Sequence, residues 1–169
     1  MIKKALLAIM LALPMLAAAQ AQIKIGTVQI DPIVDAMPET AQMKTQLEAD
    51  QKTYQDELEK LGAELDKKVA EYQKLAQDGT TPQSILERRM QEVQELQQKA
   101  QLFSNQAQQE MQRKYEQLMA PVQEKLTNAI KAVGAENGFT LILPEGVAAY
   151  QSTDVIDATP LVKARLGIK

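Results

Sequence analysis

The residues of this chain that could do chemistry are mostly carboxylates, and they lie in stretches that also carry many Lys and Gln residues. Asp56 with Glu57, and Glu92 with Glu95, have the side-chain types that general acid and base catalysis uses. The charge pattern around both pairs favours a solvated helix face instead. The sequence contains no His and no Cys, which excludes Ser-His-Asp triads, Cys-His pairs and the usual zinc ligand sets. We therefore expect a protein that is not an enzyme.

Neither a metal nor a nucleotide cofactor is expected. Asp31, Asp35 and Glu39 have the oxygen atoms of a calcium site, but helix capping and surface solvation explain these residues without a metal. The seven glycines are scattered and form no glycine-rich phosphate loop. The sequence therefore contains no recognisable binding motif for ATP or a similar cofactor.

Two arginines near a predicted turn admit two interpretations. Arg88 and Arg89 could hold an anionic group such as a lipid phosphate. Glu87 and Glu92 lie beside them, and this spacing favours pairing within one helix.

The N-terminal residues 1–21 have the pattern of a secretory signal peptide. Lys3 and Lys4 precede an apolar run over residues 5–16, and small residues then permit cleavage after Ala19 or Ala21. The run is shorter than the roughly 20 residues that a membrane-spanning helix needs. Because the chain has no cysteine, a lipid anchor and disulfides are excluded. We expect a soluble, exported mature protein.

The composition of the mature chain is typical of long exposed helices. Without Lys3 and Lys4 the formal net charge falls from −3 to about −5, which argues against nucleic acid as a partner. Two Phe, four Tyr and no Trp provide few aromatic anchors, and Gln, Glu and Lys are abundant. A large single core is not expected.

Apolar residues recur at helical spacing on both sides of a turn. From Met43 to Ala76, and again from Ile85 to Val133, they are mostly three or four residues apart. The segment "DGTTP", residues 78–82, separates the two stretches. The pattern predicts a long antiparallel helical hairpin over residues 39–133, with its tip at 78–82 and a thin apolar seam between the helices.

Prolines mark the predicted ends and hinges of these helices. Thr81 is a plausible N-cap, with Pro82 as the first helical residue. Pro121 should bend or interrupt the second helix, because a proline inside a helix costs roughly 3 kcal/mol. Pro38 and Pro121 are therefore the candidate hinges.

The two ends of the mature chain, residues 22–38 and 134–169, are expected to form one small body of strands and short helices. Alternation and β-branched residues predict strands at Ile23–Val28, Phe139–Leu143 and Val147–Tyr150. So small a body cannot bury enough apolar area to hold two long helices, and its unpaired strand edges favour pairing with other copies. The fold class is α+β and mainly α, in an oligomer.

An apolar cluster near the tip also admits two interpretations. Ile85, Leu86 and Met90 could form a contact patch for a bound partner, or they could be the last layer of the hairpin seam. The sequence does not decide between the two.

The two ends of the mature chain resemble one known family. "TLILPEGVAAYQSTDVIDATPLVKARLG" resembles the C-terminal segment of the Skp (OmpH) family of periplasmic chaperones, and "IKIGTVQIDPIVDAMPE" resembles its first strand and short helix. A signal peptide, a long hairpin, the tip and a closing β segment follow in the family's order. The resemblance covers essentially the whole mature chain, and only the two ends are specific.

The resemblance implies a homotrimer in which strands of three subunits form a small β-barrel body. Three helical hairpins would hang from this body as tentacles around a cavity. The residues carried over to the trimer body are Ile23, Ile25, Val28, Phe139, Leu141, Leu143, Val147, Tyr150 and Val155.

The function that the resemblance implies is that of an ATP-independent periplasmic holdase. It would bind unfolded outer-membrane proteins between the tentacles and prevent their aggregation before insertion. The resemblance also implies lipopolysaccharide or anionic lipid as a partner. The net negative charge of this chain disfavours binding of such an anionic ligand. The alternative is a structural coiled-coil adaptor or spacer of the cell envelope, although the short ends leave no room for the modules that flank adaptor hairpins.

Overall fold

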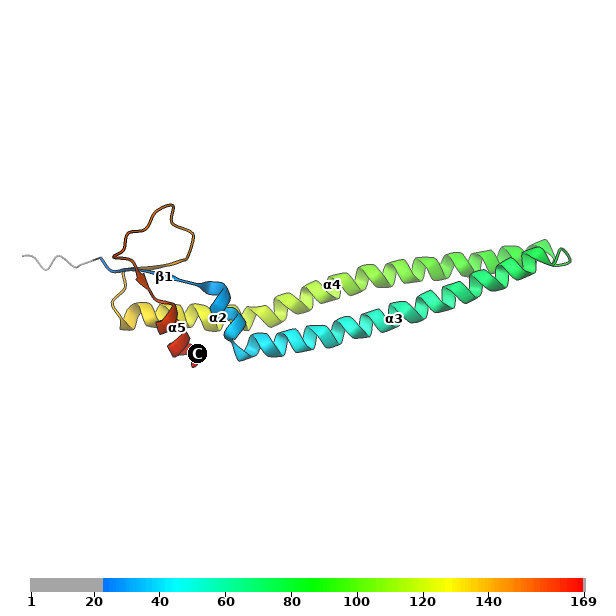
Figure 1. Ribbon diagram of the computed structural model, residues 1–169. Coiled ribbons are helices and arrows are strands. Elements are labelled where there is room, and N and C mark those ends of the chain that lie inside the picture. The colour runs from blue at the N-terminus through cyan, green and yellow to red at the C-terminus, as the bar shows by residue number, and fades with distance from the viewer. Residues whose placement is uncertain (1–22, 169) are drawn as a thin grey trace, which may run out of the picture.

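The computed structural model describes residues 23–168, so the predicted signal peptide and its cleavage sites lie outside the described residues. The chain is mainly helical with a small sheet, and a long hairpin extends from a body at one end (Figure 1). In chain order the elements are β1 (Ile25–Val28), α2 (Ile30–Ala36), α3 (Pro38–Gln77), α4 (Gln83–Glu136), β2 (Leu141–Pro144), β3 (Ile156–Asp157) and α5 (Thr159–Leu166).

Helices α3 and α4 form the hairpin and lie side by side along it (Figure 1). At about 1.5 Å per residue, α3 is roughly 60 Å long and α4 roughly 80 Å long, and the excess of α4 runs into the body. Few apolar side chains are buried along the hairpin itself. They are Met43, Leu61, Val93, Leu96 and Ala107. The seam is therefore thin, as its narrow apolar stripe predicts.

Most helix ends differ by a residue or two from the sequence prediction, and α4 continues three residues beyond the expected end at 133. Thr81 was expected as the N-cap of α4, but Pro82 occupies that position, in an extended conformation with ψ of 141°. Extended backbone at Met37 separates α2 from α3, and Pro38 is the first residue of α3. Gly79 follows the end of α3 with φ of 67°, a left-handed conformation that glycine adopts without strain.

Pro121 does not interrupt α4, so of the two outcomes expected at this proline only a bend remains. The helix continues from Gln83 to Glu136 with Pro121 inside it. Pro121 is exposed, whereas Val122 and Leu126 beside it are buried, and their burial offsets the missing backbone hydrogen bond. Figure 1 shows α4 curving between its body part and its hairpin part.

The sheet has three parallel strands in the order β2-β1-β3. Ile25 of β1 pairs with Leu141 of β2, and Gly26 pairs with Ile156 of β3 on the other side. The predicted strand at Val147–Tyr150 is wrong for the protomer, because no neighbouring strand pairs with it within residues 23–168. This segment belongs to the loop between β2 and β3.

The core of the body is formed by segments from both ends of the chain. It joins β1, α2, the last part of α4 and α5 through one cluster of buried side chains, which are Val28, Ile33, Leu126, Ala129, Val133 and Val162. Phe139 packs beside this cluster, and the Lys24 ammonium lies 4.3 Å from the centre of its ring. The core thus fixes the base of α4, and with it the base of the hairpin.

Two glycines provide a matched test of this packing. An alanine Cβ at Gly26 would lie 2.7 Å from Cε1 of Phe139 and 3.2 Å from the carbonyl oxygen of Ile156. We expect Gly26→Ala to lower the free energy of unfolding by about 1–3 kcal/mol, since the aromatic ring must move. Gly62 lies inside α3 with no neighbouring atom within 4 Å of an added Cβ, so Gly62→Ala should raise stability by roughly 0.5–1 kcal/mol.

Urea denaturation followed by far-ultraviolet circular dichroism measures both changes. Equal stability of the Gly26→Ala variant and the parent would contradict the tight packing of Phe139 on β1.

Candidate functional site

The first candidate surface lies along the outer edges of the small sheet. Within the described residues, β2 and β3 each pair with β1 on one side and have no partner on the other. Unpaired strand edges present free N–H and C=O groups that can accept a strand of another chain. Large apolar side chains around these edges are exposed, among them Ile23 (70%), Val147 (64%), Tyr150 (84%) and Ile156 (41%).

The structure separates the residues predicted for the trimer body into three groups by exposure. Val28 is 2% exposed and belongs to the core of the single chain. Phe139, Leu143 and Val155 are half-buried in the protomer. The remaining residues are exposed, and they are Ile23, Ile25, Leu141, Val147 and Tyr150. Ile156 is exposed beside them in β3, a strand that the sequence did not predict.

The predicted tip residues do not form a single cluster. Leu86 and Met90 line a groove of about 550 Å³ near the tip together with Tyr72 of α3, whereas Ile85 is 40% exposed and does not line it. The rest of this groove consists of Gln83, Glu87, Gln91 and Gln94.

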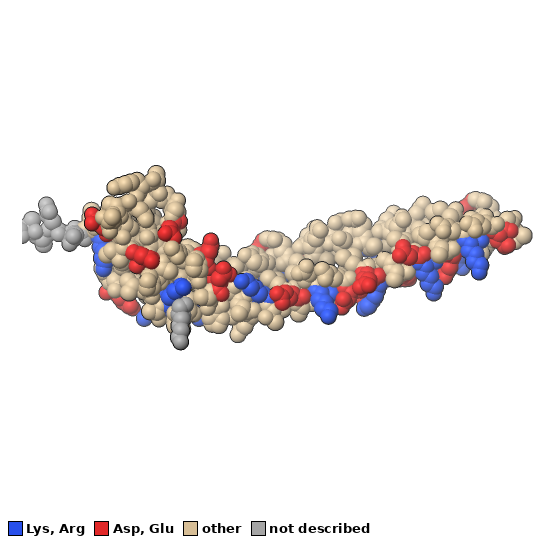
Figure 2. Space-filling model, in the orientation of Figure 1, with Lys and Arg blue, Asp and Glu red and all other residues tan. Residues whose placement is uncertain are grey.

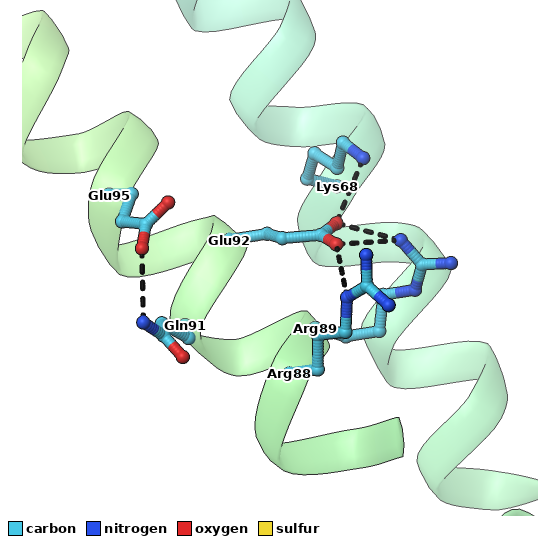
Figure 3. Close-up of polar contacts among 6 residues, drawn as sticks. All are labelled: Lys68, Arg88, Arg89, Gln91, Glu92 and Glu95. Carbon is cyan, nitrogen blue, oxygen red and sulfur yellow. Dashed lines mark hydrogen bonds and ion pairs between the residues drawn. The ribbon is translucent and has the colours of Figure 1, made fainter. Parts of the chain in front are cut away.

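A partly exposed cluster of ion pairs joins the two helices below the tip. Glu92 of α4 accepts from Lys68 Nζ of α3 at 3.0 Å and from Arg89 Nη1 at 2.7 Å, and Arg88 Nε lies 3.6 Å away (Figure 3). The hydrogen bonds from Arg89 and Lys68 hold the pKa of the Glu92 carboxyl below its usual value. Both arginines considered for an anionic lipid therefore contact this carboxylate.

A second ion pair ties the hairpin to the body. Lys125 of α4 contacts Glu39 in the first turn of α3, and the hydrogen bond that it donates lowers the pKa of the Glu39 carboxyl. Lys44 donates to Asp35 at 2.9 Å. Among residues 23–168, no three His, Cys, Asp or Glu side chains are grouped closely enough to hold a metal ion.

Charged side chains gather along one edge of the hairpin, and the opposite surface in the same view is nearly free of them (Figure 2). A groove of about 310 Å³ on the charged side is lined by Glu64, Lys68, Glu92, Glu95, Leu96 and Lys99. The uneven distribution means that the hairpin has two chemically different sides.

The uncharged side carries a larger groove of about 640 Å³, which we call the neutral groove. From α3 it is lined by Leu47, Gln51, Tyr54, Gln55 and Leu58. From α4 it is lined by Ser104, Ala107, Gln108, Met111, Gln112 and Tyr115. None of these side chains carries a charge at neutral pH. The Tyr54 ring lies 6.1 Å from that of Phe103, at an interplanar angle of 59°.

The sequence analysis did not predict the neutral groove, although the sequence of α4 contains one indication of it. Residues 100–109 contain no Asp, Glu, Lys or Arg, in a chain of which about a quarter is charged. Because ten consecutive residues cover every side of a helix, such a run indicates a segment that is free of charge all round, including the side that lines the groove. The α3 side gives no comparable signal, because its charged residues alternate with the groove residues along the sequence.

Comparison with known proteins identifies the relatives of this chain. The model of the family described as "Outer membrane protein (OmpH-like)" matches residues 24–166. The chain belongs to the OmpH-like family. The chaperone protein Skp of Photorhabdus luminescens is 30% identical over 145 residues, which cover 83% of this chain and 84% of that protein. The family is thus one of chaperones rather than enzymes.

A solved structure shares the fold of this OmpH-like chain. The crystal structure of an OmpH-like protein from Caulobacter crescentus CB15 superimposes with a TM-score of 0.72 at 17% identity, over 85% of this chain and 83% of the other.

In the part of the chain that the structure describes, no helix has both the length and the apolar character required to cross a bilayer.

The Glu92 cluster predicts how the stability of the hairpin depends on pH. Because the folded-state pKa of Glu92 is lowered, its contribution is fully present above the ordinary value of 4.5 and is lost as the pH falls through the lowered folded value. We expect Glu92→Gln to lower the melting temperature at neutral pH. The difference from the parent should shrink as the pH approaches about 3.

The matched control is Glu95→Gln, because Glu95 accepts a hydrogen bond from Gln91 of its own helix (Figure 3). At neutral pH, Glu92→Gln should lower the melting temperature more than Glu95→Gln does. A constant difference between the Glu92→Gln variant and the parent across the pH range would show that the charge of Glu92 is not what stabilises the hairpin.

Proposed function

We propose that this protein is an ATP-independent periplasmic holdase, which binds unfolded outer-membrane proteins and prevents their aggregation before insertion. The observation that carries the proposal is the combination of a small body with open strand edges and a long hairpin that buries few of its own side chains. Membership in the OmpH-like family supports the same function.

The proposed assembly is a homotrimer whose strands close a small barrel. In the single chain Leu141 and Ile156, on the two outer strands, are each more than a third exposed. Pairing of these edges between copies would satisfy the free backbone groups and cover the apolar side chains of the loop, including Tyr150. Closing the body in this way would hold three hairpins around one cavity.

The proposed mechanism uses many weak contacts rather than one tight site. An unfolded outer-membrane strand exposes apolar residues that would face lipid in the barrel, and these cannot be hidden in water. Hairpins around a cavity raise the effective concentration of contact groups, so modest contacts add up to useful avidity. Preferential binding of the unfolded client opposes aggregation by mass action.

Two proline positions are the proposed hinges of the hairpin. Pro38 begins α3 directly after the extended residue Met37, and Pro121 lies in α4 close to the body. Bending there would let the cavity fit clients of different sizes. Lipid is not required by the proposal, because Arg88 and Arg89 both contact Glu92.

Aggregation of a denatured barrel protein tests the proposed function directly. A urea-denatured outer-membrane protein is diluted into buffer with and without the mature chain, and light scattering is followed. We expect a molar excess of trimer to suppress most of the scattering. Unchanged scattering would contradict the holdase and would favour the alternative of a structural coiled-coil spacer.

A charge at the open sheet edge should prevent assembly. Ile156→Lys places an ammonium on β3, where burial between copies would cost several kcal/mol for an unpaired charge. Native mass spectrometry should detect a trimer for the parent and a single chain for the variant. Leu102→Lys is the matched control, because Leu102 is 62% exposed on the hairpin, away from the body. A trimeric Ile156→Lys variant, or a monomeric parent, would contradict the proposed assembly.

A further inference from the structure

The two sides of the hairpin differ in charge because of their place on each helix. On α4, nine residues separate Lys99 from Gln108, which is two and a half turns at about 3.6 residues per turn. These side chains therefore project from opposite sides of α4. Lys99 lines the charged groove, and Gln108 lines the neutral groove.

Several charges of the hairpin are engaged with one another. Besides the Glu92 cluster, Lys114 Nζ of α4 lies 3.5 Å from Asp50 Oδ2 of α3. Within α4, Arg113 lies 3.2 Å from Glu110. An apolar ligand on this side would have to desolvate paired charges, which is costly. The charged side is therefore poorly suited to an apolar chain.

The neutral groove has the opposite chemistry. Its floor contains aliphatic, thioether and aromatic groups such as Leu58, Met111 and Tyr115, and Tyr115 is 43% exposed. Its rim contains amides such as Gln51 and Gln108. A glutamine amide both donates and accepts hydrogen bonds, so it can pair with either backbone group of an extended chain. A methionine side chain adapts to apolar groups of different shapes.

The face of α4 that carries the neutral groove continues to the tip groove, where Glu87 is the one charged residue of the lining. Met90 and Gln108 are eighteen residues apart, which is five turns, so both face the same way. Met90 lines the tip groove together with Leu86. From Leu86 to Tyr115 the surface is roughly 44 Å long at about 1.5 Å per residue. A membrane-spanning β-strand of about 9–11 residues is roughly 30–36 Å long when extended.

We infer that the neutral groove, together with the tip groove, binds an extended segment of the length and apolar alternation of one outer-membrane β-strand. This inference rests on the proposed function and specifies its contact surface. Recognition depends on the scarcity of charge in these two grooves, where Glu87 is the single charged residue of the lining. An apolar strand that covers a lysine or a carboxylate removes it from water without a partner. The long-range attraction of opposite charges has no part in it.

Charge substitutions of both signs test this inference. One variant carries Gln51→Lys, Gln55→Lys and Gln108→Lys, and a second carries Glu at the same three positions, which line the neutral groove. The affinity for a dye-labelled, urea-denatured outer-membrane barrel protein is measured by fluorescence anisotropy. Both variants should bind it roughly tenfold more weakly than the parent, whichever sign is introduced.

Matched controls place the same charges on other surfaces of α4. The controls change Gln98, Gln106 and Gln109, which do not line the neutral groove, to three Lys or to three Glu. They should bind the client as the parent does. The affinity of the parent should change little between about 50 mM and about 500 mM salt, because no exposed charge pair forms on binding.

Each result separates the inference from its rivals. Opposite effects of Lys and Glu in the groove, or steep salt dependence, would show electrostatic recognition and overturn the inference. Parent-like binding by both groove variants would place the client elsewhere, while the holdase function would stand. Loss of the trimer in the groove variants, measured by light scattering on a sizing column, would show that the groove is a contact between copies. Failure of the parent to bind any client would contradict the proposed function itself.

Discussion

A pair of helices can bury only one seam between them, and the rest of this structure depends on that constraint. Each helix has a single stripe that faces its partner, and the other sides of both helices stay in water. The hairpin accordingly buries few side chains, such as Leu61 and Leu96, over tens of ångströms. Its stability must come partly from elsewhere. Cross-helix ion pairs such as Lys68 with Glu92 and anchoring in the body are the contributions that the structure shows.

The body meets this need by using α4 as part of its own core. Leu126 and Val133 of α4 pack with Ile33 of α2 and Val162 of α5, so the returning helix is clamped by both ends of the chain. The sheet of this body has two unpaired edges. β1 is the central strand, and nothing in residues 23–168 pairs with the outer edges of β2 and β3. The apolar residues of the body that pack against α4 and anchor the hairpin are not available to cover the edges of β2 and β3.

The helices could be predicted from the sequence, and the sheet could be predicted only in part. Apolar spacing of three or four residues is a local signal, so it fixed α3 and α4 within a residue or two at most ends. Pairing of strands is not local: β-branched residues at Val147–Tyr150 indicate a segment able to pair, but not whether a partner lies beside it. The sequence also left open whether Pro121 bends α4 or interrupts it, since burial of Val122 and Leu126 is a tertiary effect that outweighs a local preference.

The candidate surfaces show the same division between local and tertiary information. Pairing of Arg88 and Arg89 with Glu92 follows from helical spacing alone, whereas the contact with Lys68 needs the register of the two helices. The neutral groove also needs the register of the two helices, because both helices line it. Only its α4 side is indicated by the sequence, through the charge-free residues 100–109.

The separation of charged and uncharged sides allows the long hairpin both to stay soluble and to contact an apolar partner. The full sequence carries a formal net charge of −3, and charged residues favour the solubility of exposed helices. Charges spread evenly around the hairpin would also oppose contact with any apolar partner on every side, because each contact would desolvate some of them. Gathering charges such as Lys68, Glu92 and Lys99 on one side preserves solubility and leaves the side of Gln51 and Gln108 free for contact. Glutamine suits that side because its amide is hydrated in the free protein and needs no counter-ion when it is covered.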